Sequence, residues 1–558
     1  MTPPRLGSTR SRWMFGAACG ALLALFAAPA MAASCESLAG LSTGQMTITR
    51  ASPAGALAGI ATSLKGQPDP APFCRVAGYL TPTRDSHIAF EVWLPAPEAW
   101  NGKFQSVGNG GFLGALNYRA ALQGLNRHYA VMTTDLGHEN AGGAAEDATW
   151  ALGHPEQVID YAYRGEHLST LAAKTLIAAY YGAAPKHSYF TGCSAGGVSG
   201  MTELLRYPDD YDGYLIGDAL PDHLGQEVAA LWTTLEASLK YPDQALKPGQ
   251  VAALHDAVLH RCAGKDGGLS TDAFLTDPSK CRFDPATLKC RPGAVTGTCL
   301  STEQVAIVEH LYGGPRNPRT GQALMAGITP GSEKSWDKYF TGRTNPAEAD
   351  RPWSGFLTYM AYSDPDYLKT LRYLKFDFER DVTALRRQEI AGETLDASWN
   401  SRNRDIDAFA AAGGKVIQYH GWDDPNISPL EAVAFRESLI ADLAERDHLT
   451  RAAAAEKAAA YYRLFMIAGM GHCAGGDGPW KIAPADQNAP DPQHDMLTAL
   501  ERWVEAGVPP EQFIGAHPQA NTGSSDMTRP VCVYPKVPVW TGQGAPSDAG
   551  NFKCTLKD

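Results

Sequence analysis

The feature that most constrains the fold is the alternation of short strand-like runs with helical patterns. β-Branched and aromatic residues gather in runs at 87–94, 103–107, 129–134, 187–191, 211–216, 415–419 and 462–467. Helical patterns separate several of these runs, as at 166–181, and another at 496–505 follows the last run. Strands that alternate with helices are typical of a mainly parallel sheet with crossover connections. The sequence therefore predicts an α/β fold.

The alternation stops near Pro221 and resumes near Lys415. The intervening segment carries four cysteines and turn-rich sequence such as Gly314–Gly321. An insertion of this length is large enough to form a second domain, and its position after a strand places it over the ligand crevice of the sheet. We therefore expect a catalytic domain made of residues 33–221 and 400–558, with an inserted lid domain at 222–399.

The first 32 residues have the pattern of a secretory signal peptide. Three arginines precede an apolar run at 14–28, and the small-residue sequence Ala30-Met31-Ala32 follows it. A membrane-spanning helix needs about 20 apolar residues, and this run is shorter. We expect cleavage before Ala33, a mature protein without a membrane partner, and a secreted or periplasmic location.

The net charge argues against a nucleic-acid partner. The chain has 48 Lys and Arg against 60 Asp and Glu, which gives a formal charge of −12 at pH 7. Nucleic-acid binding needs clustered basic side chains that neutralise phosphates. The share of hydrophobic residues, 44%, is that of a globular protein and excludes a disordered chain.

Of the eleven cysteines, Cys19 lies in the predicted signal peptide, which leaves ten. An exported chain meets an oxidising compartment in which thiols pair, and the absence of Cys-x-x-Cys argues against a zinc site. Short loops suggest three local pairs, which are Cys262 with Cys281, Cys290 with Cys299, and Cys532 with Cys554. The sequence spacing leaves open how the other four pair, which are Cys35, Cys74, Cys193 and Cys473.

A candidate nucleophile follows the run at 187–191. The sequence Gly192-Cys-Ser-Ala-Gly196 lies between this strand-like run and a helical pattern, which is the setting of the Gly-x-Ser-x-Gly nucleophile elbow. Small neighbouring residues allow a tight turn, which projects the serine hydroxyl away from the adjacent strand and helix. We interpret Ser194 as the nucleophile; the alternative is an ordinary glycine-rich connection.

A serine nucleophile needs a base and an acid that orients the base. His472 lies on a glycine-rich loop after the last strand-like run, and the run before it ends in a sequence that offers Asp423 and Asp424 as acids. Asp218, after the run at 211–216, is a second candidate acid. His420 is interpreted as a structural residue at a strand end.

Two cysteines adjoin these candidates, because Cys193 precedes Ser194 and Cys473 follows His472. A disulfide requires Cα atoms about 4.4–6.8 Å apart. If these two cysteines pair, the serine and the histidine are neighbours in the fold; the alternative is a free, buried Cys193.

The sequence resembles the tannase and feruloyl esterase family of α/β-hydrolases, in which a disulfide joins the neighbours of the catalytic Ser and His. The matching stretches are 108–114, 134–138, 189–197, 206–213, 420–424, 469–473 and 529–535. The resemblance implies an α/β-hydrolase fold and the triad Ser194, Asp424 and His472. It also implies five disulfides, which are Cys35 with Cys74, Cys193 with Cys473, Cys262 with Cys281, Cys290 with Cys299, and Cys532 with Cys554.

The resemblance further implies a structural Ca²⁺ in the lid, bound by the loop between Cys262 and Cys281. Ca²⁺ takes six to eight oxygen ligands. Asp266 and Asp272 are the candidate ligands, together with backbone carbonyls, whereas Ala263 stands where an Asp is expected. No cofactor is expected for catalysis.

The function that we expect is hydrolysis of small-molecule esters of aromatic acids, such as hydroxycinnamoyl or galloyl esters. The backbone N–H of Ala195, with that of Gly110 or Gly111, is expected to hold the oxyanion. The alternatives are a terephthalate half-ester hydrolase of the same family and an inactive binding protein on the same fold. The preferred acid and the oligomeric state are left open.

Overall fold

A computed structural model of the chain describes residues 33–140, 144–293, 297–341, 352–402, 406–482, 491–518 and 525–556. The expected signal peptide, residues 1–32, lies outside them. In the described part of the chain, no helix combines the length and the apolar character that a membrane crossing needs.

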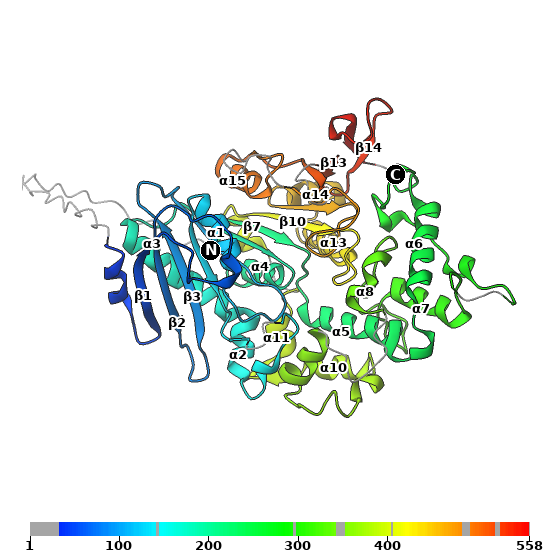
Figure 1. Cartoon of the computed structure of the whole chain (residues 1–558), viewed down its shortest axis with the longest axis horizontal. Coiled ribbons are helices and arrows are strands. Elements are labelled where there is room, and N and C mark those ends of the chain that lie inside the picture. Colours follow the sequence, from blue (N-terminus) through cyan, green and yellow to red (C-terminus); the bar gives the residue numbers. More distant parts are fainter. Residues whose placement is uncertain are drawn as a thin grey trace, which may run out of the picture.

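A nine-stranded sheet forms the centre of the molecule, with the order β1-β2-β3-β5-β4-β6-β7-β10-β11 (Figure 1). Its strands are β1 (Met46–Ala54), β2 (Phe73–Leu80), β3 (Ile88–Pro95), β4 (Lys103–Val107), β5 (Ala130–Thr134), β6 (His187–Cys193), β7 (Gly213–Gly217), β10 (Lys415–Gly421) and β11 (Tyr462–Ile467). From β5 to β11 all neighbours pair in parallel, whereas β1, β2 and β3 form an antiparallel extension. The predicted α/β fold is confirmed, and β1 and β2 are strands that the sequence pattern missed.

Helices cover both faces of this sheet. The apolar sides of α3, α4, α13 and α14 pack in one hydrophobic cluster with Phe190 of β6, whereas α1 and α15 pack in another with Tyr189. Because successive strand side chains point to opposite faces, the two clusters lie on opposite sides of the sheet. These helices and their neighbours in the chain are α1 (Tyr118–Asn126), α2 (Pro155–Ile159), α3 (Gly165–Tyr181), α4 (Ala195–Arg206), α12 (Asp407–Ala411), α13 (Pro429–Arg446), α14 (Arg451–Ala459) and α15 (Met496–Ala506).

The described residues between β7 and β10 add no strand to the central sheet and form a mainly helical body beside it (Figure 1). Its elements are α5 (His223–Thr234), α6 (Pro248–Cys262), α7 (Thr302–Gly313), α8 (Trp336–Tyr339), α9 (Pro352–Gly355), α10 (Arg380–Arg386), the hairpin β8 (Glu389–Ile390) and β9 (Glu393–Thr394), and α11 (Leu395–Trp399). One cluster joins Leu224 and Trp399 of this body to Phe112 and Tyr161 of the preceding segment. The boundaries at 221/222 and 399/400 therefore stay a prediction, because hydrophobic packing continues across them.

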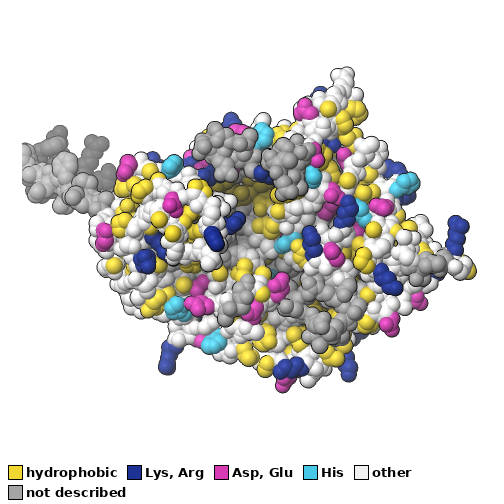
Figure 2. Space-filling view, in the orientation of Figure 1, with side chains coloured by type: hydrophobic (Ala, Val, Ile, Leu, Met, Phe, Trp, Pro, Cys, Tyr) yellow, Lys and Arg dark blue, Asp and Glu magenta, His cyan; other side chains and the backbone are white. Residues whose placement is uncertain are grey.

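The chain ends in two hairpins, which pair β12 (Gln512–Pro518) with β13 (Ser525–Cys532) and β14 (Val537–Trp540) with β15 (Phe552–Thr555). On the face shown in Figure 2, described Lys and Arg side chains are scattered among Asp and Glu. That face presents no continuous basic surface.

Five disulfides join the ten cysteines that follow the expected signal peptide. The bond of Cys532 with Cys554 ties one terminal hairpin to the other, since these residues lie on β13 and β15. In the helical body, Cys299 is bonded to Cys290, nine residues earlier in the chain. The pairs are those expected, namely Cys35 with Cys74, Cys193 with Cys473, Cys262 with Cys281, Cys290 with Cys299, and Cys532 with Cys554.

Candidate active site

Ser194 lies in a sharp turn between β6 and α4, with a left-handed φ of 60°. Its glycine neighbours are required by the close packing of this turn. A Cβ on Gly196 would lie 2.4 Å from the carbonyl oxygen of Asn109, and one on Gly192 would lie 2.4 Å from the oxygen of Gly196. The strained backbone and small neighbours are those of a nucleophile elbow.

His472 and Asp424 lie at the same edge of the sheet as Ser194, in the loops that follow β11 and β10. The His472 Nε2 atom is 2.7 Å from the Ser194 hydroxyl, and its Nδ1 atom is 2.8 Å from Asp424 Oδ2. The other carboxylate oxygen of Asp424 accepts hydrogen bonds from the backbone N–H groups of Asn426 and Ile427. The structure therefore brings together the three residues that the sequence singled out, in the order nucleophile, base and acid.

A disulfide joins the loops that carry Ser194 and His472. The bond between Cys193 and Cys473 joins the residue before Ser194 to the residue after His472, and their Cα atoms are 6.1 Å apart. Cys473 has a φ of 60°, so both bridged loops carry a residue in the left-handed region beside the reacting side chains. Such strain persists only where the surroundings hold it in place.

Asp218, the second candidate acid, contacts the backbone of the two catalytic loops. Its carboxylate accepts hydrogen bonds from Gly421 N at 2.8 Å and from Cys473 N at 2.9 Å. His420 lies between Asp218 and Asp424, with its Nε2 atom 3.0 Å from the Ile427 carbonyl oxygen. Both residues are fully buried, so they position the loops that carry the acid and the base.

The buried carboxylates control the charge on the histidine. Burial lowers the pKa of the His472 imidazole, but the adjacent Asp424 carboxylate outweighs burial and raises this pKa to about 9. Burial also opposes ionisation of Asp424, yet its contacts with His472 and His420 hold the pKa of this carboxyl below its usual range. Asp424 is therefore the anion that stabilises a positively charged His472.

The expected oxyanion groups lie around the same serine. Ala195 begins α4, and Gly110 and Gly111 lie on the loop after β4. Among the described residues, the N–H groups of Gly110 and Gly111 meet no acceptor. The loop is held by the Tyr161 hydroxyl, which donates to the Gly111 carbonyl at 2.9 Å. These N–H groups are available to a negatively charged oxygen.

A cavity of about 440 Å³ opens in front of Ser194 and His472. The catalytic domain contributes Gly110 and Gly111 to its wall, and the inserted segment contributes α5, α8 and Trp353. The sequence alone could not identify the lid part of this wall, because α5 carries no motif. The volume suits a small-molecule ligand.

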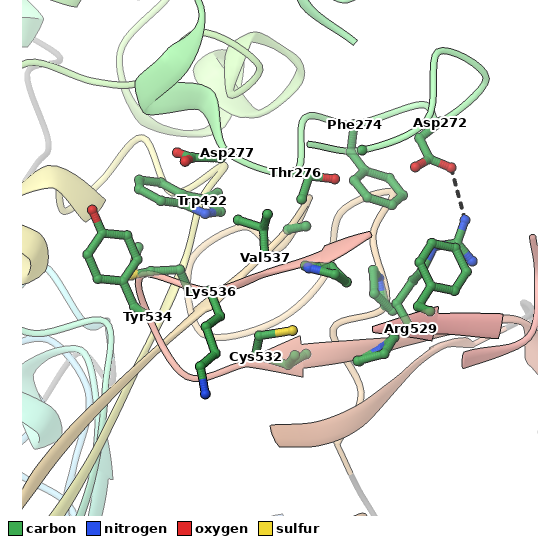
Figure 3. A pocket seen from close by; sticks show the side chains of 18 residues that line it. Asp272, Phe274, Thr276, Asp277, Trp422, Arg529, Cys532, Tyr534, Lys536 and Val537 are labelled. Atoms are coloured by element: carbon green, nitrogen blue, oxygen red, sulfur yellow. Dashed lines mark hydrogen bonds and ion pairs between the residues drawn. The ribbon is translucent and has the colours of Figure 1, made fainter. Parts of the chain in front are cut away.

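The candidate calcium ligands are engaged by other partners. Asp272 Oδ1 is 3.0 Å from the guanidinium of Arg529 on β13, and both side chains are buried (Figure 3). The carboxylate of Asp266 accepts hydrogen bonds from the backbone N–H groups of Gly268, Thr276 and Asp277. Among the described residues, no third His, Cys, Asp or Glu converges with this pair to complete a cation site. The donor set does not fit Ca²⁺, because it offers only two carboxylates for an ion that takes six to eight oxygen ligands, and the guanidinium of Arg529 already pairs with one of them.

Comparison with known proteins identifies the family of the chain. A family model described as "Tannase and feruloyl esterase" matches residues 74–555. An uncharacterized esterase of Xanthomonas campestris pv. campestris is 34% identical, over 96% of this chain and 93% of its own. A probable feruloyl esterase B-1 of Aspergillus flavus is 30% identical, over 86% of each chain.

Solved structures show the same architecture. The crystal structure of feruloyl esterase B from Aspergillus oryzae matches with a TM-score of 0.80 and 25% identity, over 93% of this chain and 99% of that one. The tannin acyl hydrolase from Aspergillus niger matches with a TM-score of 0.70 and 21% identity, over 92% of each, which supports the fold alone. The chain is therefore an α/β-hydrolase of the tannase and feruloyl esterase family, a carboxylic ester hydrolase that acts on small-molecule esters.

Proposed function

We propose that the protein is an exported serine esterase that hydrolyses esters of aromatic acids, with hydroxycinnamoyl and galloyl esters as the substrate class. The observation that carries this proposal is the chain of contacts from Asp424 through His472 to the Ser194 hydroxyl, which faces the lid cavity. Export is supported by the signal pattern at residues 1–32 and by the disulfides.

In the proposed mechanism, Ser194 attacks the ester carbonyl while His472 takes the hydroxyl proton. Asp424 keeps the imidazole in the required tautomer and stabilises the imidazolium. The N–H groups of Ala195 and of Gly110 or Gly111 stabilise the oxyanion. His472 then protonates the leaving alcohol, and water, activated by the same histidine, releases the acid from the acyl-enzyme.

The Ser194→Ala variant tests this proposal, since it removes the nucleophile and leaves the elbow backbone unchanged. We expect unchanged thermal unfolding and a loss of about 10⁴-fold or more in the hydrolysis of methyl ferulate and methyl gallate. Activity within tenfold of the parent would rule out this nucleophile. A parent protein that binds these esters without hydrolysing them would instead support an inactive binding protein.

A further inference from the structure

Helix α4 begins directly after the nucleophile Ser194, and its last turn carries a buried carboxylate that the esterase mechanism does not use. Glu203 is 0% exposed, and among the described residues neither of its carboxylate oxygens has a hydrogen-bond donor. A buried carboxylate without a partner is strongly unfavourable, so it needs either a proton or a cation. The side chains around Glu203 decide between the two.

Two other metal-ligating side chains converge with Glu203. They are His167 of α3 and Asp210, which lies in the turn between α4 and β7, and one ligand atom from each of the three residues lies within 4.8 Å of the others. Asp210 is buried as well, and its Oδ2 atom is 2.6 Å from Nδ1 of His167. The His167 ring stacks on Tyr207, with the ring centroids 3.6 Å apart. A shared proton needs only the two carboxylates, whereas a metal ion needs a third donor such as this imidazole.

The basic side chains near this group of ligands are directed elsewhere. Lys174 donates to the backbone carbonyl oxygen of Asp210 at 2.5 Å, and Arg206 donates to backbone carbonyl groups of the inserted segment. Among the described residues, no lysine or arginine forms an ion pair with Glu203 or with Asp210. The two adjacent carboxylates therefore carry negative charge that a divalent cation would offset.

The types of donor atom select the kind of ion. Zn²⁺ binds imidazole nitrogen and carboxylate oxygen, and in sites with three protein ligands water completes the tetrahedral arrangement. Ca²⁺ takes six to eight oxygen ligands, which this group does not supply. The site contains no cysteine, so it differs from the zinc sites that the cysteine spacing argues against. The His167 side chain is 21% exposed, which gives an ion a path from solvent.

We propose that His167, Glu203 and Asp210 bind one Zn²⁺ ion, which joins α3, α4 and the turn before β7. Glu203 lies about 13 Å from Ser194 along the helix axis, and none of the three ligands lines the cavity in front of Ser194. The ion therefore stabilises the helix that follows the nucleophile and takes no part in ester hydrolysis. This inference goes beyond the proposed function and does not depend on which ester is the substrate.

The experiment measures zinc binding by the folded protein. The parent, His167→Gln and Glu203→Gln are treated with EDTA, dialysed against metal-free buffer and titrated with Zn²⁺, and the bound metal is measured by inductively coupled plasma mass spectrometry. The parent should bind one Zn²⁺ per chain. The Kd should rise about 100-fold or more in both variants, because even the outer partners of metal ligands contribute about 10–100-fold.

His154→Gln is the matched control for these variants. His154 forms a similar contact with an aspartate, since its Nδ1 atom is 2.7 Å from Asp85 Oδ1, but among the described residues no further ligand converges with this pair. This control should keep the Kd of the parent.

Thermal unfolding distinguishes an ion at this site from one held at the surface. Zn²⁺ at about 100 times its Kd should raise the Tm of the EDTA-treated parent by about 3 °C, whereas Ca²⁺ should leave it unchanged. Glu203→Gln should show no rise with either ion. The kcat of the parent at permissive temperature should be unchanged by removal of the zinc, because the ion lies away from the cavity.

A parent that binds no Zn²⁺ would overturn the inference and indicate that Glu203 and Asp210 share a proton. An unchanged Kd in both variants would overturn it as well and indicate an adventitious ion only. If Glu203→Gln does not fold, the Kd of His167→Gln decides, because His167 is partly exposed and its replacement leaves the buried carboxylates in place. A parent that binds zinc as expected but hydrolyses none of the aromatic esters would overturn the proposed function and leave this inference intact.

Discussion

Two loops of this molecule are joined to distant parts of the chain, one by a disulfide and the other by a buried ion pair. The loop with His472 is joined to the nucleophile elbow by the disulfide between Cys193 and Cys473. The lid loop between Cys262 and Cys281 is joined to β13 by the ion pair of Asp272 and Arg529 (Figure 3).

The two ties act at different places. The disulfide is adjacent to both Ser194 and His472, so it limits how far the nucleophile and the base can separate. The lid loop contributes no residue to the lining of the cavity in front of Ser194. We therefore expect the disulfide of Cys193 and Cys473 to affect the rate of the reaction. The ion pair of Asp272 and Arg529 should instead affect the stability of the fold.

The largest effect should come from His472→Ala, which removes the base at the first of these loops. We expect kcat for an aromatic methyl ester to fall about 10⁴-fold, because the Ser194 hydroxyl loses its proton acceptor. Steady-state kinetics measure this loss. His494→Ala, at a partly exposed histidine, is the control and should retain the parent rate.

Removal of the disulfide in Cys193→Ala/Cys473→Ala should lower kcat by about 100-fold, because small displacements of reacting groups have effects of this size. The matched control is Cys290→Ala/Cys299→Ala, which removes a disulfide between residues that do not line the cavity. This control should lose thermal stability and keep its kcat at permissive temperature. If both variants show the same kcat, the disulfide beside Ser194 and His472 has no special effect on the reaction rate.

Arg529→Met tests the second tie, because it leaves the Asp272 carboxylate buried without its cation. We expect the free energy of unfolding in urea to fall by about 3 kcal/mol. Arg319→Met is the control, since the ion pair of Arg319 with Glu379 is screened by solvent and its loss should leave the free energy of unfolding nearly unchanged.

The same lid loop should not depend on calcium. We expect Ca²⁺ to leave the Tm of the EDTA-treated parent unchanged, because the loop offers only two carboxylates and Arg529 already pairs with one of them. Differential scanning calorimetry with EDTA and then with excess Ca²⁺ measures this. A Tm that falls with EDTA and recovers with Ca²⁺ would show that the loop binds calcium and would contradict this expectation.

The smallest effect should be a shift in the pH profile. The unprotonated His472 is the base, and the carboxylates that favour its protonated form raise its pKa to about 9, so kcat/KM should rise with pH above the ordinary histidine range. Asp218 adds to this effect, and Asp218→Asn should move the acid limb to lower pH. Asp366→Asn, on the exposed lid surface, should leave the limb in place.

The fold and the catalytic residues could be read from the sequence because their signals are local. The elbow around Ser194 needs small residues at fixed offsets, and His472 and Asp424 follow recognisable strands. Catalytic residues that directly follow parallel strands lie close together in the fold, because parallel strands end at the same edge of the sheet.

Contacts between residues that are distant in sequence leave no local pattern from which they could be predicted. Asp272 and Arg529 are far apart in sequence, so the sequence could not predict their ion pair. Helix α5 carries no motif in the sequence, so only the structure shows that it lines the cavity in front of Ser194. β1 was missed because it lies at the edge of the sheet, is partly exposed and lacks a clear strand pattern. β2 lies between β1 and β3, and its alternation of buried and less buried residues was overlooked in the sequence.

The most direct test of the account is to trap the acyl-enzyme during turnover of methyl ferulate by rapid acid quenching, followed by peptide mass spectrometry. We predict a feruloyl group on Ser194 in the parent and no adduct in Ser194→Ala. A feruloyl adduct on another residue, or an adduct that persists in Ser194→Ala, would contradict the assignment of the nucleophile.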